Sequence, residues 1–387
     1  MTEITYADFE RVGPGTLAGR YLRRFWQPVS RVKDLKPGYA QPIELMGERF
    51  TLYRGEGGDP HLVAFRCAHR GTQLSVGWVE GDCIRCRYHG WMYDGSGQCV
   101  EMPGEDEAYA ARVTIRTYPV CEYLGLVFAY LGEGDPPPLR RFPDFERPGL
   151  VETGVPEIWP CSYFSRIDND PGHVPYTHRE SQLRAGRSAQ IGDRSTTVTE
   201  TEYGVRSAVL APGRPPFYIH FHMPNINQTR SVVRVEGTME DAQRLFVDRL
   251  FWRVPINDDR CISFVVDFLH LTGEEAQAYA QRRQRSEEAE GPSPNEIGEA
   301  ILRGNLRVED VAPETSMYKL FWIEDYVTQV GQGPSRERPP ERLASIDQTV
   351  ILKRAIWERE LKALADGRPL KEWTEPAGLA DMSSVGG

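Results

Sequence analysis

The chain has 387 residues, of which 40% are hydrophobic and 26% are charged, enough apolar material for the cores of two or three soluble domains. The formal net charge of −10 comes from 46 basic and 56 acidic residues, and no stretch is dominated by Lys and Arg, which argues against a protein built around nucleic acid. No apolar run reaches the roughly 18–20 residues of a membrane span, and the opening MTEITYADFERVGPG lacks the apolar segment of a signal peptide, so we expect a cytoplasmic protein.

The first part of the chain predicts a short helix followed by a small all-β domain. Residues 17–26 have the apolar spacing of an amphipathic helix, and residues 40–132 consist of short alternating runs separated by Gly, Asp and Pro turn signals. The Pro- and Gly-rich stretch 132–149 is a natural boundary. We therefore expect an N-terminal helical segment over 1–39 that packs on the second domain, and an all-β domain over 40–149.

Two short motifs in the all-β domain carry metal-ligand chemistry. They are Cys67-Ala-His69 and Cys86-Arg-Tyr-His89, with sixteen residues between them. The seven cysteines of the chain are an odd number at low density, which is a poor disulfide framework and leaves metal ligation or reduced core thiols. A zinc site uses the same ligand types, but zinc fingers usually pair Cys with Cys and His with His. One Cys and one His in each turn favours a [2Fe–2S] centre, in which two Cys hold one iron and two His hold the other.

The stretch 67–103 resembles the Rieske domain of ring-hydroxylating oxygenase large subunits. The match includes Arg-Gly after His69, Tyr-His-Gly-Trp around His89, and a Gly-Xaa-Gly turn leading to Pro103. The resemblance implies that a [2Fe–2S] cluster is held by Cys67, His69, Cys86 and His89. The two-residue spacing to His89 selects Cys86 rather than its neighbour Cys83. The other cysteines are expected to be small buried side chains, namely Cys83, Cys99, Cys121, Cys161 and Cys261.

The rest of the chain, residues 150–387, predicts an α+β domain with an antiparallel sheet flanked by helices. Helical sequence is expected around 165–183, over 272–306 and over 341–367. Strand-like runs are expected at 196–210, 217–222, 231–236, 245–254 and 261–270. The expected fold class is therefore α+β, with a small all-β domain first.

A second candidate metal site lies in Asp168-Asn-Asp-Pro-Gly-His-Val-Pro-Tyr-Thr-His178. Two imidazoles and one carboxylate form the facial triad that binds oxygen-activating Fe(II). His173 and His178 are about 140° apart on a regular helix, but a π-type turn near Pro175 would bring both rings to one side. Alternatively, the two histidines are ordinary structural residues, and Asp170 is a helix N-cap followed by proline.

This segment also resembles the oxygenase family, whose large subunits carry Asp-x-x-His-x4-His here. The resemblance implies that His173 and His178 bind a mononuclear Fe(II). It also implies a homotrimer in which Asp170 bridges the cluster ligand His89 of one subunit to His173 of the next.

In the family the third iron ligand is an Asp from a long helix near the C-terminus. The best match is Asp325 in LFWIEDYVTQVGQGP, which resembles the Glu-Asp-x-x-x-Gln stretch of phthalate-dioxygenase-like members. Glu324 is adjacent, but it would face another side of a helix. Asp310 and Asp347 are weaker rivals with looser sequence context.

The resemblance implies a terminal oxygenase component of the phthalate-dioxygenase-like or aryl O-demethylase-like group. Such an enzyme uses Rieske-delivered electrons and O2 at Fe(II) to hydroxylate, dihydroxylate or O-demethylate a small aromatic substrate, here expected to be acidic. NADH would act through a separate reductase or a ferredoxin, because the chain has no GxGxxG strand–turn–helix of its own. The alternatives are a Rieske-type electron carrier without oxygenase activity, which would leave more than half of the chain without a role, and a zinc-stabilised binding module.

The substrate pocket is the least defined part of the sequence. On a strand, His220 and His222 would point to the same side, toward the pocket or toward a core. An acidic substrate needs a cationic anchor, for which the candidates, each alternatively a surface charge, are Arg166, Arg179, Arg184 and Arg206.

Overall fold

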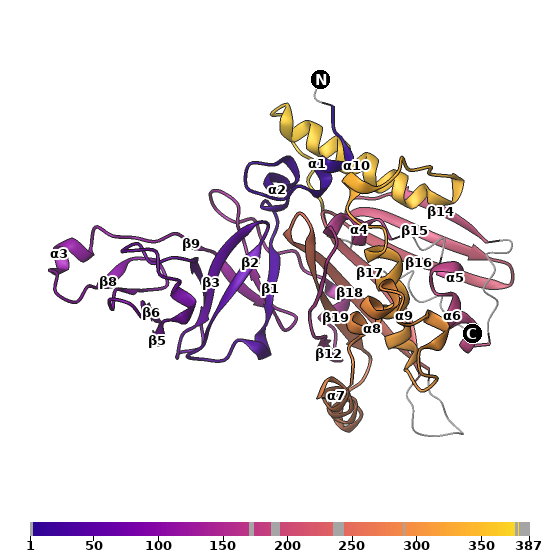
Figure 1. Cartoon of the computed structure of the whole chain (residues 1–387), viewed down its shortest axis with the longest axis horizontal. Coiled ribbons are helices and arrows are strands. Elements are labelled where there is room, and N and C mark those ends of the chain that lie inside the picture. Colours follow the sequence, from indigo (N-terminus) through magenta and orange to yellow (C-terminus); the bar gives the residue numbers. More distant parts are fainter. Residues whose placement is uncertain are drawn as a thin grey trace. The chain divides into compact units, whose positions relative to one another are not determined.

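The computed structural model describes residues 3–169, 174–186, 194–234, 244–288, 291–375 and 378, and it divides into two compact units (Figure 1). The β unit comprises Arg11–Arg140 and Val254–Asp258. The α+β unit comprises Met1–Glu10, Arg141–Arg253 and Asp259–Gly387. The N-terminal segment expected over 1–39 is thus divided between the units. No helix in the described ranges is long and apolar enough to cross a membrane.

The β unit is built from three small sheets, whose strand orders are β1-β11-β10, β2-β3-β4-β9 and β5-β6-β7-β8. Its core brings together Tyr53, Leu74, Ile84 and Tyr93, all fully buried. Its main helices and strands are α2 (Leu17–Leu22), β1 (Gln27–Arg31), β2 (Ala40–Leu45), β3 (Glu48–Arg54), β4 (Pro60–Ala64), β5 (Trp78–Glu80), β6 (Cys83–Arg85), β7 (Met92–Tyr93), β8 (Cys99–Glu101), α3 (Glu107–Ala110), β9 (Thr117–Tyr118), β10 (Val120–Tyr123) and β11 (Leu126–Ala129).

The α+β unit is built on an eight-stranded sheet in the order β12-β19-β18-β17-β16-β15-β14, with β13 also pairing with β19. The strands are β12 (Leu150–Thr153), β13 (Glu157–Trp159), β14 (Ser195–Glu200), β15 (Gly204–Ala211), β16 (Arg214–His222), β17 (Ile226–Arg234), β18 (Arg244–Asn257) and β19 (Arg260–Leu269). The helices are α1 (Tyr6–Glu10), α4 (Tyr163–Ile167), α5 (Val174–Thr177), α6 (Arg179–Arg184), α7 (Gly273–Glu288), α8 (Pro294–Leu302), α9 (Met317–Val330) and α10 (Gln348–Ala365).

Helices α9 and α10 cover the same face of this sheet. Ser316 caps the start of helix α9, where its side chain accepts the backbone N–H of Lys319, and Trp322 on this helix packs against Phe251 of β18. On α10, the hydroxyl of Thr349 lies 3.1 Å from that of Ser207 on β15. Because side chains alternate along a strand, the helices cover the face that carries a row of paired residues across β15, β16, β17 and β18, namely Ser207, Ile219, Thr229 and Arg249.

The α+β class is confirmed, but one expected strand differs in detail. The run expected over 196–210 is two strands, because the chain reverses before Gly204. A side chain there would lie 2.2 Å from the carbonyl oxygen of Phe221, and the φ angle of +149° also favours glycine. The helical sequence expected around 165–183 contains α4, α5 and α6, and residues 170–173 within it lie outside the described residues.

Candidate metal centres

The two Cys/His motifs of the β unit form loops with the same backbone pattern. The N–H of Cys67 donates to the carbonyl of Thr72, and the N–H of Cys86 donates to that of Trp91. Glycines close both loops: Gly71 and Gly90 have φ angles of +75° and +78°, and each donates back to the cysteine carbonyl. Only glycine adopts this left-handed conformation at little cost, which explains why each motif ends in His-Gly or His-Arg-Gly.

The four side chains of these loops meet in two pairs. The thiols of Cys67 and Cys86 are buried, at 3% and 2% exposure, and they contact each other through a hydrogen bond. The rings of His69 and His89 lie outside them, with centroids 4.5 Å apart. The hydroxyl of Tyr93 lies 3.2 Å from the sulfur of Cys67. Two inner thiols and two outer imidazoles are the donor set that a Rieske cluster requires.

A second pair of ligand-type side chains lies in the α+β unit. The Nε2 atom of His178 is 3.1 Å from Oδ1 of Asp325, although the residues are 147 positions apart in the chain. The same Oδ1 accepts from the amides of Asn169 at 3.2 Å and Gln329 at 3.1 Å. Both side chains are largely buried, at 12% and 18% exposure. An imidazole nitrogen and a carboxylate oxygen this close can serve one metal ion.

Glu324, the residue before Asp325, binds the backbone that follows His178. His178 is the N-cap of α6, but its side chain makes no capping hydrogen bond. Instead, Glu324 accepts the N–H of Glu180 at 2.7 Å, and the N–H and hydroxyl of Ser181. A carboxylate from α9 therefore satisfies the orphan N–H groups at this helix start, where negative charge is favourable. Burial raises the pKa of Glu324 above its ordinary value, and its hydrogen bonds oppose the shift.

Buried charges surround Asp325. Burial by itself raises its pKa, but the hydrogen bond and charge of His178, with the Arg166 guanidinium, hold it below the ordinary range. Burial and the charge of Arg166 lower the pKa of Arg253 to about 9. Burial raises the pKa of Glu157. Asp325 is thus kept ionised, as a metal ligand must be.

The other candidate ligands are placed as follows. Asp170 and His173 lie outside the described residues. Asp310 pairs with Arg307 at the surface, and Asp347 accepts from the N–H of Ala344. Within the described part, no group of three or more His, Cys, Asp or Glu side chains could hold one metal ion. Each iron of a [2Fe–2S] cluster takes only two protein ligands, so the paired Cys and His side chains need no group of three. The facial triad does need three ligands, and its third member besides His178 and Asp325 would be His173.

The two strand histidines share a face, as the alternation predicts, but it is the face turned away from α9 and α10. His220 pairs across the sheet with Arg206 and Gln228, whereas the helix-facing Phe221 pairs with Asn227. The hydroxyl of Tyr203 lies 2.7 Å from Nδ1 of His220, and burial lowers the pKa of His220 to about 4. Both histidines therefore lie in a core on the side opposite Asp325.

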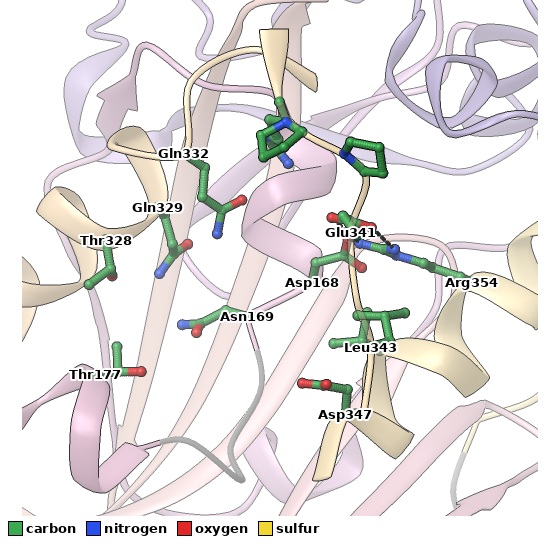
Figure 2. A pocket seen from close by; sticks show the side chains of 14 residues that line it. Asp168, Asn169, Thr177, Thr328, Gln329, Gln332, Glu341, Leu343, Asp347 and Arg354 are labelled. Carbon is green, nitrogen blue, oxygen red and sulfur yellow. Dashed lines mark hydrogen bonds and ion pairs between the residues drawn. The ribbon is translucent and has the colours of Figure 1, made fainter. Parts of the chain in front are cut away.

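A cavity of about 470 Å3 is lined by residues of α9, of α10 and of the segment that follows α4 (Figure 2). Asn169 and Gln329, which donate to Asp325, are part of its lining. Its lining also contains Asp168, Glu341 and Asp347, together with Arg338 and Arg354, Pro339, Pro340 and Leu343.

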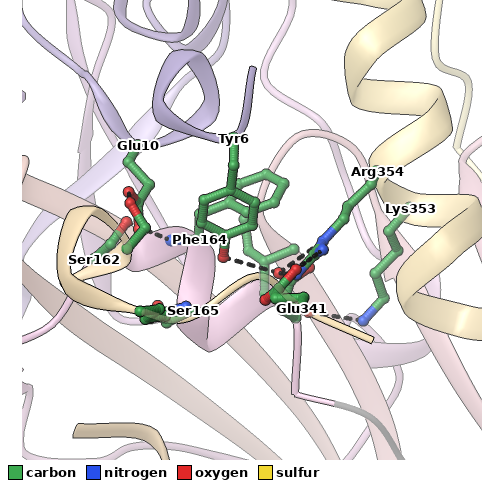
Figure 3. A network of polar contacts seen from close by, with 12 residues as sticks. Tyr6, Glu10, Ser162, Phe164, Ser165, Glu341, Lys353 and Arg354 are labelled. Carbon is green, nitrogen blue, oxygen red and sulfur yellow. Dashed lines mark hydrogen bonds and ion pairs between the residues drawn. The ribbon is translucent and has the colours of Figure 1, made fainter. Parts of the chain in front are cut away.

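A polar network anchors the chain at the end of α4 (Figure 3). Arg354 of α10 donates to Asp168 at 2.6 Å, and the hydroxyl of Tyr6 donates to the same oxygen at 3.0 Å. Lys353 donates to the carbonyl of Ile167 at 2.7 Å. These contacts fix the backbone immediately before Asn169.

Sequence reasoning assigned no role to Asn169 or to Gln329, the last residue of the Glu-Asp-x-x-x-Gln stretch, and it gave Arg166 a different role. One signal was available for Gln329, because it follows Asp325 by four residues and so shares its helix face. The contacts of Asn169 and Arg166 join segments far apart in the chain, and local pattern carries no information on them.

A β unit with paired Cys/His loops, together with a unit bearing a buried His–carboxylate pair, is characteristic of a redox protein with an iron–sulfur centre and a separate metal site. The Rieske [2Fe-2S] domain family matches residues 25–119. The chain is 29% identical over 374 residues to the 5,5'-dehydrodivanillate O-demethylase oxygenase subunit of Sphingobium sp. (strain NBRC 103272 / SYK-6), covering 93% of this chain and 80% of the relative.

A second relative matches over a shorter region. It is the phenoxybenzoate dioxygenase subunit alpha of Ectopseudomonas oleovorans, 41% identical over 170 residues, which span 43% of this chain and 41% of that one. Two solved structures share the fold. Pseudomonas putida CBB5 NdmA has a TM-score of 0.65 and 18% identity, and the match covers 90% of this chain and 93% of that one. Dicamba monooxygenase bound to dicamba has a TM-score of 0.63 and 20% identity, and the match covers 89% of this chain and 99% of that one. Residues 25–119 therefore form a Rieske [2Fe-2S] domain, and over most of its length the chain is similar to the oxygenase subunit of an O-demethylase.

Proposed function

We propose that this chain is the terminal oxygenase component of a system that hydroxylates, dihydroxylates or O-demethylates a small aromatic substrate. Cys67, His69, Cys86 and His89 would hold the [2Fe–2S] cluster. His173, His178 and Asp325 would hold a mononuclear Fe(II), which supplies oxygen activation when bound.

The approach of His178 to Asp325 carries this proposal. An electron carrier has no use for a buried imidazole–carboxylate pair formed by segments 147 residues apart. Asn169 and Gln329 orient the carboxylate, and Glu324 anchors the backbone next to the imidazole. These residues have roles in an oxygenase and none in an electron-transfer protein, which is the alternative reading.

We propose a homotrimer in which the cluster of one subunit serves the iron of the next through Asp170. Two features support it. The imidazole of His69 is exposed, as is the neighbouring Tyr88 at 57%, so that the β unit presents its histidine ligands outward. In the α+β unit, Asn169 lines the cavity, and Asp170 is the next residue in the sequence.

Electrons would come from NADH through a separate reductase or a ferredoxin. The carbazole 1,9a-dioxygenase structure that shares this fold is a complex of oxygenase and ferredoxin, which supports a ferredoxin-type donor. The seven cysteines form no disulfides, which suits the cytoplasmic location that we propose.

We propose an aromatic acid as the substrate, in the group of aryl O-demethylases and carboxylated-arene hydroxylases. Relatives named for 5,5'-dehydrodivanillate, phenoxybenzoate and 3-chlorobenzoate support this class. O-demethylation would consume the methyl ether, O2, two electrons and two protons, and yield the phenol, formaldehyde and water.

The test is a single turnover with chemically reduced protein, which needs no partner. Aromatic acids and methoxyarenes are added with 18O2, and formaldehyde and labelled phenols are quantified. Purified protein should hold three iron atoms per chain. Two irons per chain, with reoxidation by O2 and no product from any substrate, would establish the electron carrier instead.

A further inference from the structure

Arg166, at the end of α4, is a charged side chain buried beside the candidate iron site. It is 1% exposed, and its guanidinium carbon lies 3.4 Å from the ring centre of Trp159. Stacking on an indole compensates part of the loss of hydration. A buried cation is nevertheless costly unless hydrogen bonds satisfy it, so the partners of this guanidinium indicate what it does. Its burial also removes it from the set of substrate anchors that the sequence suggested.

Among the described residues, the guanidinium makes one hydrogen bond. It donates from Nη1 to Oε1 of Gln329 at 2.7 Å, whereas Nε and Nη2 have no hydrogen-bond partner among those residues. No carboxylate forms a salt bridge with it in the described part of the chain. The hydrogen bond of Arg166 therefore goes to a neutral amide, whereas an arginine that only stabilises the fold through an ion pair would contact a carboxylate.

Gln329 is 3% exposed and stands between Arg166 and Asp325. It follows Asp325 by one helical turn on α9, and its Nε2 donates to Oδ1 of the carboxylate at 3.1 Å. An amide has one accepting and one donating end, and a guanidinium can only donate. Arg166 therefore selects the orientation in which the amide oxygen faces the cation and the N–H2 faces the carboxylate.

We infer that Arg166 and Gln329 are positioning residues that act in series on the iron ligand Asp325. Gln329 holds the carboxylate rotation directly, and Arg166 holds Gln329. Groups of this kind, which hydrogen-bond to a ligating side chain, typically change metal affinity by about 10–100-fold when they are removed. The inference rests on the proposed function, because it takes Asp325 as an iron ligand.

The test measures Fe(II) affinity anaerobically by competition with a chromophoric chelator, with the absorbance of the cluster as the internal reference. Arg166→Met, Gln329→Leu and the double variant form a thermodynamic cycle. We expect each single variant to weaken Fe(II) binding by about 10–100-fold, and the double variant to be no weaker than the worse single one. Arg166→Lys keeps a donor for Gln329 and should restore part of the loss.

A second readout follows the geometry of the site without turnover. The EPR spectrum of the nitric oxide complex of the mononuclear iron depends on ligand orientation, so its rhombicity should change in the same way in both single variants. Gln332→Leu, at an exposed position just beyond the end of α9, and Arg249→Met, which removes a buried arginine paired with Asp267, are the matched controls. Neither should alter Fe(II) affinity or the nitrosyl spectrum.

The outcomes separate the inference from the proposed function. If Asp325→Ala retains wild-type Fe(II) affinity, the ligand assignment is wrong and the proposed function loses its main support. If Asp325→Ala loses iron while either single variant binds it normally, or if the two losses multiply in the double variant, the relay is wrong. Should Arg166→Met fail to fold, Arg166→Lys and Gln329→Leu decide, since wild-type Fe(II) affinity in Gln329→Leu would show that Gln329 does not hold Asp325 and would overturn the relay.

Discussion

Removing the carboxylate of Glu324 should destabilise the α+β unit and release its mononuclear iron. Glu324 accepts hydrogen bonds from the N–H groups of Glu180 and Ser181 and from the Ser181 hydroxyl. Glu324→Ala would leave two backbone donors unpaired at the start of α6, in a position where no other described side chain replaces the carboxylate. His178 is the residue immediately before this helix, so its imidazole would lose its fixed position.

The magnitude follows from the contacts. Hydrogen bonds to a charged acceptor contribute about 1.5–3 kcal/mol each, so three of them represent roughly 5 kcal/mol or more. Part of this is offset, because burial of the carboxylate is itself unfavourable, as the raised pKa of Glu324 indicates. We therefore expect a net loss of about 3 kcal/mol. For a unit of this size, that corresponds to a fall in Tm of roughly 6–12 °C.

The assay combines thermal unfolding followed by circular dichroism with iron analysis of the same preparation. Glu324→Ala should retain the two irons of the cluster and lose the third. Glu360→Ala is the matched control, because Glu360 is also a buried acid that accepts a backbone N–H, from Lys371, but it lies on α10. It should lower Tm and keep the third iron. A Glu324→Ala protein with wild-type Tm and full iron would refute the capping role.

Four further outcomes are expected. Asp325→Ala should lose the mononuclear iron and all oxygenation while its Rieske absorbance stays; normal turnover would show that the third ligand has been misassigned. Cys86→Ser should abolish the red-brown colour of the cluster, and a coloured, active variant would contradict the assignment. Asp170→Asn should keep all iron but slow reoxidation of the reduced protein in a single turnover; a wild-type rate with only a lower Tm would make Asp170 a helix N-cap. His220 has a pKa of about 4 when folded and about 6.5 when unfolded, so the unfolded chain binds the extra proton and stability should fall by up to about 3 kcal/mol as pH drops from 6.5 to 4. His220→Gln should flatten that slope in urea unfolding, and an unchanged slope would place the titrating group elsewhere.

The Cys/His motifs and the fold class could be predicted from the sequence, because both depend on residues close together in the chain. The paired Cys/His motifs could be recognised because each loop is closed by a glycine within five residues of its cysteine. The α+β class followed from alternating strands and a long terminal helix. The division of 196–210 into two strands was missed, because the alternation continues through the reversal before Gly204 and no Asn-Gly or Asp-Gly marks it.

The candidate site could be predicted only in part, since tertiary contacts define most of it. The sequence itself indicated the spacing from His173 to His178 and a helix around Asp325. That Asp325 would lie close to the histidines was expected only from the resemblance to the oxygenase family. Arg166 read as a surface charge or a substrate anchor, but it is buried under Trp159 and bonded to Gln329. A charged residue gives no sequence signal for burial, because its cost is met by partners far along the chain.

Helix α9 organises this site through two adjacent residues with different tasks. Successive residues on a helix differ by about 100°, so Glu324 and Asp325 point in different directions. Both nevertheless contact the segment 178–181. Glu324 accepts the backbone N–H groups of Glu180 and Ser181, and Asp325 contacts the side chain of His178. The imidazole is thus fixed at its backbone and at its tip. Loss of the backbone anchor leaves Asp325 intact but removes the constraint that brings His178 to it, which is why we expect Glu324→Ala to lose iron without any change in the ligands themselves.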